Sequence, residues 1–325
     1  MALLRPVTDD EIATYQRDGV VHLRKIIDQH WVGELRAAIT DIMENPISTA
    51  ASLTNLGLMS NDPDQVKGFV AGSDWTSDND YAALTARTNP ALSGQVLIDE
   101  SVSDTAAERG QFFHAGNAWM HNQTVRDLCL HSPMPEVAAT LMQSSHAYLY
   151  GDQVLVKGPL TREKTAWHQD YGYGHYEGLQ ICAVRMPCDS ETRDTGTVGY
   201  VRGSHRPSVV YKVNYFVSNA ASPDDDGVLV PEIDGHEDEF DIVYFTPEPG
   251  DLVIHDIATL HGGGGNRSET QTRRAITVRY AGDDAVYKKR KMAPPQALEP
   301  TLEPGQPIGD DPVSFPRAWP PKARA

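Results

Sequence analysis

The short pattern Trp167-His168-Gln169-Asp170 carries the clearest potential for chemistry in this chain. In an extended segment, residues two apart point to the same face, so His168 and Asp170 would present an imidazole and a carboxylate side by side. Such a pair forms two-thirds of the facial triad that binds non-haem iron(II). Because H-x-D patterns also occur by chance in surface turns, this one indicates a metal site only together with a third ligand.

A candidate for the third ligand ends the segment of residues 249–261. A Pro-Gly-Asp turn leads into an apolar strand that ends at His261, and the glycines after it let the backbone come close to a bound small molecule. His255 lies in the same segment, either as an alternative ligand or as an ordinary packed histidine. The glycines and the spacing to the next arginines favour His261.

Two arginines open the next apolar segment, and the first of them, Arg273, stands twelve residues after His261. A strand arginine that enters a pocket can hold a carboxylate through two parallel hydrogen bonds. Because neighbouring residues of a strand point to opposite faces, only one of Arg273 and Arg274 can be this clamp. Arg273 is the preferred candidate.

Taken together, these segments resemble the phytanoyl-CoA dioxygenase family of iron(II)- and 2-oxoglutarate-dependent oxygenases, which includes ectoine hydroxylases. The resemblance spans roughly residues 110 to 282, and it is carried by Lys157, the Trp167-His168-Gln169-Asp170 block, Gly203-Ser204-His205, Gly250-Asp251, Leu260-His261-Gly262, Asn266-Arg267-Ser268 and Arg273-Arg274-Ala275.

The resemblance implies a fold, a ligand set and a reaction. The implied fold is a double-stranded β-helix, a jelly-roll or cupin-like core. His168, Asp170 and His261 would bind Fe(II), and Arg273 would hold the distal carboxylate of 2-oxoglutarate, which is converted with O2 to succinate and CO2. Related halogenases lack the carboxylate ligand, so the presence of Asp170 favours hydroxylation.

The cosubstrate site departs from the family pattern at one position. The family often has serine two residues after the distal histidine, where this chain has Gly263. Ser268 is therefore a candidate for the missing polar contact. Gln153, which shares a strand face with Lys157, and Gln169 inside the metal motif are further candidates to contact 2-oxoglutarate.

Five residues are candidates to contact the substrate: Lys157, Tyr171, Tyr173, His175 and Arg185. Those at 171–175 form an aromatic loop directly after the metal motif, which is either a substrate-facing wall or a mobile surface loop. Its tyrosines could contact an ammonium group through cation–π interactions. Arg185 could receive an anionic group of the substrate, unless it is a solvated surface residue.

The elements that must position these residues change character near residue 146. After it, short segments rich in β-formers are separated by Gly, Pro and Asp, a pattern typical of a β-sandwich or barrel. Before it, the sequence predicts a capped helix from Thr8, a strand over 19–23, a helix over 28–44 and weakly patterned loops over 47–110. It also predicts helix over 122–143, with a break marked by the proline pair Pro133 and Pro135.

We therefore predict one oxygenase domain over residues 1–325, mainly β with flanking helices. It would comprise a mainly helical N-terminal part with loops over 1–145, a β-helix core over 146–285 and a proline-rich tail over 286–325. Proline excludes regular helix and central strand from the tail. Either Leu298, Phe315 and Trp319 pin this tail to the body, or the tail is loose.

Composition argues against several other classes of protein. A formal net charge of −17 would repel phosphate backbones, which argues against nucleic-acid binding. The three cysteines contain no C-x-x-C pair, so neither a disulfide framework nor a thiolate zinc site is expected. We expect neither a membrane span nor a secretory signal, because the apolar runs are too short for either, and therefore expect a cytoplasmic protein without membrane contact. The oligomeric state stays open.

The resulting hypothesis is a dioxygenase that hydroxylates a small polar metabolite, such as an amino-acid derivative, a small phosphonate or a natural-product intermediate. Two alternatives come from other classes. One is a jelly-roll protein that binds a small molecule without turnover. The other is a zinc hydrolase that activates water with the same three residues.

Overall fold

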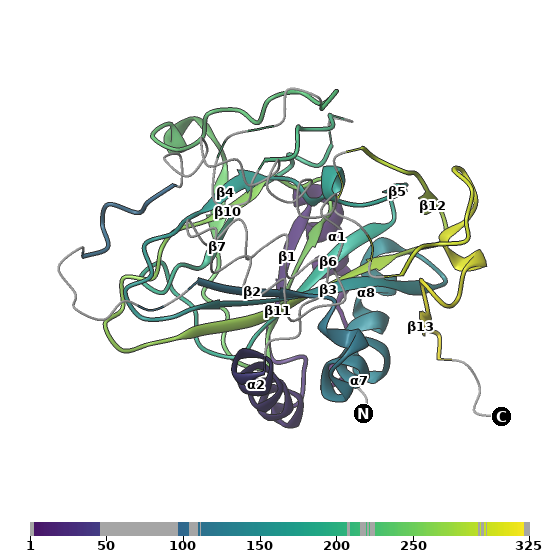
Figure 1. Cartoon of the computed structure of the whole chain (residues 1–325), viewed down its shortest axis with the longest axis horizontal. Coiled ribbons are helices and arrows are strands. Elements are labelled where there is room, and N and C mark those ends of the chain that lie inside the picture. The colour runs from purple at the N-terminus through teal and green to yellow at the C-terminus, as the bar shows by residue number, and fades with distance from the viewer. Residues whose placement is uncertain are drawn as a thin grey trace, which may run out of the picture.

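The computed structural model describes residues 3–45, 97–103, 110, 112–206, 209–214, 219, 221, 225–291, 293, 296 and 298–321. The loops expected between residues 47 and 110 lie almost entirely outside this part of the chain. Figure 1 shows the described elements as two β-sheets that face each other, with helices on the far side of the larger one.

The first helix, α1 (Asp9–Asp18), begins as its sequence predicts. The Thr8 hydroxyl accepts a hydrogen bond from the backbone N–H of Glu11, and the Glu11 carboxylate accepts one from the N–H of Thr8. This capping box satisfies two N–H groups that the helix itself cannot pair. The helix ends at Gly19, whose φ of 73° favours glycine.

Three further helices carry apolar faces toward the core. They are α2 (Gln29–Glu44), α7 (Gln123–His131) and α8 (Met134–Met142). The break expected near the proline pair lies between α7 and α8, where Pro133 precedes the first residue of α8. Trp31, Leu35 and Ile39 of α2 are buried at helical spacing, which confirms the predicted amphipathic helix.

The larger sheet has seven antiparallel strands in the order β1-β9-β6-β11-β3-β13, with β2 also paired to β3. Its strands are β1 (Val20–Leu23), β2 (Phe112–Gly116), β3 (Ala147–Lys157), β6 (Ile181–Pro187), β9 (Leu252–Asp256), β11 (Arg273–Ala281) and β13 (Arg317–Trp319). The N-terminal part of the chain therefore contributes β1 and β2 to the same sheet as the β-rich part.

The smaller sheet has four antiparallel strands in the order β4-β10-β7-β8. They are β4 (Thr165–His168), β10 (His261–Gly263), β7 (Val198–Val201) and β8 (Ile242–Tyr244). Outside both sheets, β5 (Tyr176–Glu177) pairs with β12 (Val286–Tyr287). Four short 3-10 helices complete the described elements: η1 (Ala118–Met120), η2 (Asp170–Tyr173), η3 (Glu237–Glu239) and η4 (Ile308–Asp310).

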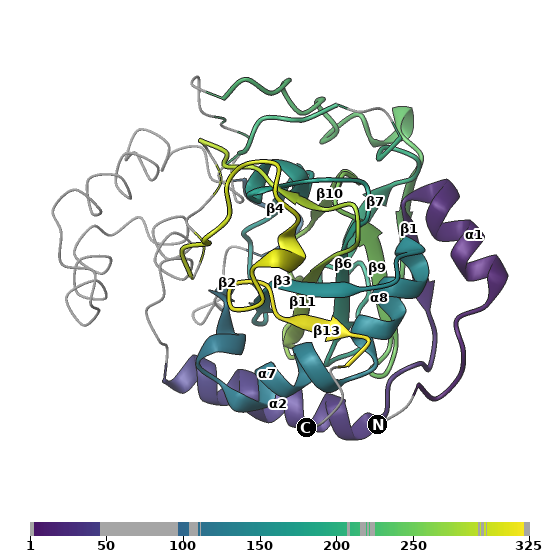
Figure 2. The ribbon, with the colours of Figure 1, turned by 90° about the vertical axis from the view of Figure 1, so that its right-hand side faces the viewer.

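The two faces of the larger sheet have different surroundings. Ile276, Val278 and Tyr280 on one face of β11 are fully buried in the core that includes residues of α2, α7 and α8. The other face turns toward the smaller sheet, and both views place α2 and α7 on the side away from that sheet (Figures 1 and 2). This arrangement confirms the predicted fold: a double-stranded β-helix of jelly-roll type with flanking helices.

The proline-rich tail is docked on the body in the residues that the structure describes. Phe315 is fully buried in a second cluster with Tyr176 and Ile308. Residues Arg317–Trp319 form β13, which pairs with the first residues of β3 at the sheet edge. Of the two alternatives for the tail, the pinned one is therefore observed, with Phe315 and Trp319 as its contacts.

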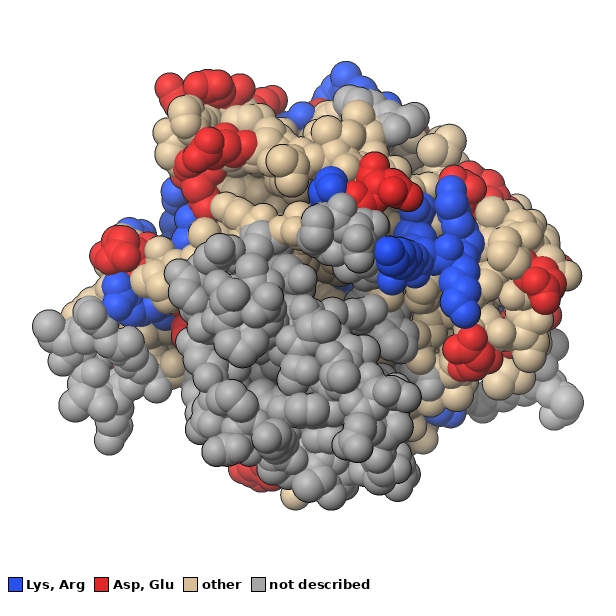
Figure 3. All heavy atoms as spheres, turned by 45° about the horizontal axis from the view of Figure 1, so that its top comes forward, with Lys and Arg blue, Asp and Glu red and all other residues tan. Residues whose placement is uncertain are grey.

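The surface carries charges of both signs. Figure 3 shows acidic and basic side chains close together on the described part of one face, with several Lys and Arg side chains gathered in one place. None of the described helices combines the length and the apolar character that crossing a bilayer requires.

Candidate metal centre

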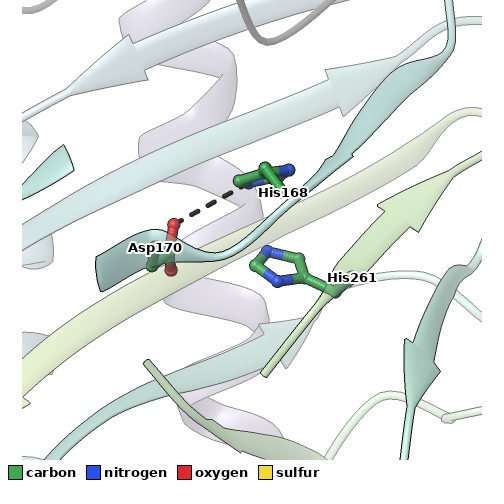
Figure 4. Close-up of side chains that lie close together, drawn as sticks. All are labelled: His168, Asp170 and His261. Atoms are coloured by element: carbon green, nitrogen blue, oxygen red, sulfur yellow. Dashed lines mark ion pairs between the residues drawn. The ribbon is translucent and has the colours of Figure 1, made fainter. Parts of the chain in front are cut away.

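Three residues from two neighbouring strands and a short helix converge between the sheets. His168 is the last residue of β4, Asp170 is the first of η2, and His261 is the first of β10. His261 stands directly opposite His168 in the strand register. One ligand atom from each of the three residues lies within 4.8 Å of the other two, and all three residues are buried. Figure 4 shows the two imidazole rings and the carboxylate turned toward one common point.

The orientation of both histidines is fixed by backbone carbonyl groups. Nδ1 of His168 lies 2.7 Å from the oxygen of Ala166, and Nδ1 of His261 lies 3.0 Å from that of Thr259. A carbonyl only accepts, so Nδ1 carries the proton and the lone pair is on Nε2. Metal-binding histidines are commonly held in this way.

Burial keeps both imidazoles neutral near pH 7. Burial, together with the neighbouring imidazole, lowers the pKa of His168 to about 3 and that of His261 to about 4. A metal ion therefore does not have to displace a proton from either ring at neutral pH.

Asp170 is held ionised by an arginine of the opposite sheet. Burial alone would raise its pKa, but Arg279 together with His255 and His261 outweighs this effect, and the pKa lies well below its usual range. Nε of Arg279 donates to Oδ2 of Asp170 at 3.0 Å, and Nη2 donates to Oδ1 at 2.7 Å. Each carboxylate oxygen keeps a further lone pair for a metal ion.

The donor set fits iron(II). Two neutral imidazoles and one carboxylate on one side of an ion match the facial triad of non-haem iron enzymes, which leaves positions open for a cosubstrate and dioxygen. The residues that would hold the ion are His168, Asp170 and His261, the three that the sequence predicts.

His255 lies beside this group without belonging to it. It comes from β9, and its Nε2 is 3.5 Å from Oδ2 of Asp170. Its ring packs 4.4 Å from that of His261 and 5.3 Å from that of Tyr200. Its Nδ1 has no hydrogen-bond partner among the described residues, and its Nε2 faces the carboxylate of Asp170. The converging ligand set thus contains His261 and not His255.

The two arginines at the start of β11 point to opposite faces. Arg274 pairs with Asp189 at 2.8 Å and is partly exposed. Arg273 is only 3% exposed and donates to the carbonyl of Gly196, while its Nε has no partner within the described chain. Burial lowers the pKa of Arg273 to about 10, so the guanidinium is still charged at neutral pH. A buried cation with no bound carboxylate is suited to receive one.

Lys157 and Arg185, both considered for substrate contact, are buried near Arg273. Lys157 stands opposite Arg273 in the sheet and donates to the carbonyls of Glu163 at 2.9 Å and Gly264 at 2.7 Å. Burial, followed by the charge of Arg273, lowers the pKa of Lys157 well below its usual value. Arg185 forms an ion pair with the buried carboxylate of Glu191 at 2.6 Å and is not a solvated surface residue.

Of the three further candidates for 2-oxoglutarate contact, the structure brings one to the centre. The Gln153 side chain accepts a hydrogen bond from Nη2 of Arg279 at 2.9 Å, next to Asp170. Gln169 instead braces a neighbouring loop, since its amide donates to the carbonyls of Val209 and Ala258 and accepts from Tyr211. Adjacent strand residues alternate in direction, so His168 and Gln169 cannot both face the ion.

Ser268 also has another role in the structure. Its hydroxyl accepts hydrogen bonds from the backbone N–H groups of Thr270 and Gln271, and so closes the turn before β11. Short polar side chains commonly cap such turns. The structure therefore offers no support for the expected contact between Ser268 and the cosubstrate.

The aromatic loop after the metal motif is packed against the body. The Tyr173 ring lies edge-on to His168 with centroids 5.6 Å apart, and its hydroxyl lies 2.7 Å from Oδ1 of Asn214. Nδ1 of His175 accepts a hydrogen bond from the N–H of Arg290, whose guanidinium lies over Tyr171. These contacts hold the loop on the body, so it is not a loose surface loop.

Sequence reasoning assigned no role to Arg279, although it contacts the metal-binding carboxylate. A signal for it was present: Arg273, Thr277 and Arg279 share one strand face because they are separated by even numbers of residues. What the sequence lacks is the identity of the opposite partner, which depends on how two distant strands approach each other.

The fold and the site define a non-haem metal centre in a jelly-roll protein, and the comparisons give the family. The model of the phytanoyl-CoA dioxygenase family matches residues 15–275. This chain belongs to that family. A search of curated proteins gave no match.

Several solved structures share the fold. The non-haem α-ketoglutarate-dependent carbocyclase SnoK from nogalamycin biosynthesis is 19% identical with a TM-score of 0.61, over 96% of each chain. The epimerase SnoN in complex with Fe3+, α-ketoglutarate and nogalamycin RO is 18% identical with a TM-score of 0.62, over 95% of this chain and 98% of that one. EctD from S. alaskensis with 2-oxoglutarate and 5-hydroxyectoine is 17% identical with a TM-score of 0.56, over 93% of this chain and 86% of that one.

Family membership and the ligand set together identify an iron- and 2-oxoglutarate-dependent oxygenase. Iron and 2-oxoglutarate are accordingly its cofactor and cosubstrate, and dioxygen is the oxidant. The similar structures include a carbocyclase and an epimerase, so one fold serves several reactions.

Proposed function

We propose that this protein hydroxylates a small polar molecule, with conversion of 2-oxoglutarate and O2 to succinate and CO2. An amino-acid derivative, a small phosphonate or a natural-product intermediate would be its substrate. Similar structures from nogalamycin biosynthesis and a structure bound to 5-hydroxyectoine support a small organic substrate. The carboxylate ligand Asp170 supports hydroxylation in preference to halogenation.

The observation that carries the proposal is the convergence of His168, Asp170 and His261 in a buried site. Both imidazoles are neutral and fixed through Nδ1, and the carboxylate is ionised. This combination binds a divalent ion without reorganisation of the protein, which is what a catalytic centre requires.

The residues of this chain would divide the work as follows. Arg273 would hold the distal carboxylate of 2-oxoglutarate through its unpartnered Nε and the rest of its guanidinium. Tyr173, packed on His168, would help to exclude water from one side of the centre. Bound iron(II) would supply the activation of dioxygen that no side chain can supply.

Anaerobic titration tests the proposal directly. We expect the metal-free protein, given iron(II) and then 2-oxoglutarate, to develop a weak visible charge-transfer band. The band should vanish in His168→Ala and in His261→Ala, with Arg274→Gln as the matched control on the opposite face of β11. With oxygen and the right substrate, one 18O atom from 18O2 should appear in the product and one in succinate.

A different result would favour one of the alternatives. Tight zinc binding with hydrolytic activity in the absence of oxygen would indicate the hydrolase, in which the same three residues activate water. Iron binding without any band or any consumption of 2-oxoglutarate would indicate a binding protein that lacks turnover.

A further inference from the structure

Arg279 has two properties that its role at Asp170 alone does not require. It lies on the inner face of β11, six residues beyond Arg273, so the two Cα atoms are about 20 Å apart along one strand face. Its side chain is 12% exposed, although the residues that surround it are mostly buried. It therefore reaches from the larger sheet into accessible space beside the metal-binding carboxylate.

Only one edge of the Arg279 guanidinium is occupied. Nε and Nη2 donate to the two oxygens of Asp170, and Nη2 also donates to Oε1 of Gln153. Nη1, which carries two further N–H groups, donates to none of the described residues. Nη1 is not one of the buried polar atoms that lack a partner, so it is accessible to solvent. We therefore place the exposed part of the side chain at this edge.

The charge balance at Asp170 indicates what the Nη1 edge of Arg279 could bind. Without a metal ion, Arg279 and Asp170 neutralise each other. A divalent ion on Asp170 would take over the carboxylate charge and leave the guanidinium as a largely buried cation without a full counterion, which is costly. An acidic group bound to the same ion would restore the balance. The oxo-acid end of 2-oxoglutarate would be such a group if it bound to the ion held by His168, Asp170 and His261.

We propose that Arg279 is a second cosubstrate arginine: one edge holds Asp170, and the Nη1 edge receives the carboxylate next to the keto group of 2-oxoglutarate. Arg273 receives the carboxylate at the other end. This inference rests on the proposed function, since it requires a 2-oxo acid at the metal. Two arginines of one strand face then orient a small diacid from both ends, while the smaller sheet supplies the histidines.

The test uses two oxo acids and two arginines. Protein saturated with iron(II) under argon is titrated with 2-oxoglutarate, which has both carboxylates, and with pyruvate, which has only the one next to the keto group. Arg279→Gln should weaken the binding of both acids by about 10- to 100-fold. Arg273→Gln should weaken the binding of 2-oxoglutarate by a similar factor. It should change the dissociation constant of pyruvate by no more than about twofold, because pyruvate has no distal carboxylate.

Controls separate binding from folding. Arg274→Gln, on the same strand but paired outward with Asp189, should change neither dissociation constant. Iron affinity is measured before either acid is added, because Arg279 also holds Asp170, and thermal midpoints confirm that each variant is folded. If Arg279→Gln does not fold, Arg279→Lys keeps the charge but lacks the planar guanidinium, and it should still weaken the binding of pyruvate.

Two results would overturn the inference. One is unchanged pyruvate and 2-oxoglutarate binding in folded Arg279 variants. The other is a loss of iron affinity alone, which would limit Arg279 to holding Asp170. Failure of the proposed function would look different, because the wild-type protein itself would then give no band with 2-oxoglutarate.

Discussion

The two main sheets meet at one site but bring different chemistry to it. The smaller sheet supplies neutral ligands, His168 and His261, from adjacent strands in direct register. The larger sheet supplies cations, Arg273 and Arg279, from one strand face. Ligands for one ion must lie within a few ångströms of each other, and paired strands provide that spacing. Cations that receive a diacid must stand apart, and the length of one strand provides that distance.

The outer faces of the sheets differ as well. The larger sheet packs on helices, and Val278 of β11 is fully buried in that core. The smaller sheet is covered by a smaller cluster that includes Trp167, Val201 and Leu260. We infer that the larger sheet contributes most of the stability of the fold, which allows it to carry buried cations. The smaller sheet contributes the two histidine ligands.

The largest expected effect is a loss of metal binding from the smaller sheet. His261→Ala should weaken iron(II) binding by more than about 100-fold, because it removes a ligand and not only an outer partner. His255→Ala, which changes a neighbouring histidine of the larger sheet, should weaken it by less than about tenfold. Anaerobic iron titration measures both. Equal losses in the two variants would contradict the division of work between the sheets.

On the larger sheet, we expect Arg273 to lower the stability of the fold and to strengthen the binding of 2-oxoglutarate. Arg273→Met should weaken 2-oxoglutarate binding by about 100-fold. In the metal-free protein it should leave the thermal midpoint unchanged or raise it, because it replaces a poorly paired buried charge by an apolar side chain. Calorimetry of the metal-free variant checks this, and a marked drop in the midpoint would show that Arg273 is structural.

A matched pair of core substitutions compares the outer faces. Val278→Ala should destabilise the fold by about 2–3 kcal/mol, because it removes two methyl groups and leaves a cavity in a fully buried position. Val201→Ala, at a position 8% exposed under the smaller cluster, should cost about 1–2 kcal/mol. Denaturant unfolding of both variants measures the difference. Equal values would mean that both outer faces are packed equally well.

The smallest effect should come from the turn that leads into β11. Ser268→Ala removes a hydroxyl that accepts two backbone hydrogen bonds, and we expect a cost of about 1 kcal/mol in stability. The dissociation constant of 2-oxoglutarate should change by no more than about twofold, because the hydroxyl serves the turn. A larger change in cosubstrate binding would restore Ser268 to the cosubstrate site.

The sequence by itself was sufficient wherever the cause of the structure is local. The Thr8–Glu11 capping box, the break before Met134 and the apolar spacing of α2 all depend on residues within one or two helical turns. The same holds for His168 and Asp170, since alternation along an extended segment puts them on one side. Alternation also predicted that Arg273 and Arg274 would point to opposite faces, as they do.

Only the tertiary structure decided which residues meet across the two sheets. That Arg279 holds Asp170, that His255 lies beside the ligands and that Gln169 braces a loop depend on strands distant in sequence. Register and sheet order set these contacts, and a one-residue slip would turn every side chain of a strand to its other face. The sequence thus determined which chemistry is available, and the packing of the sheets determined which groups share the site, because such contacts arise only from pairing at long range.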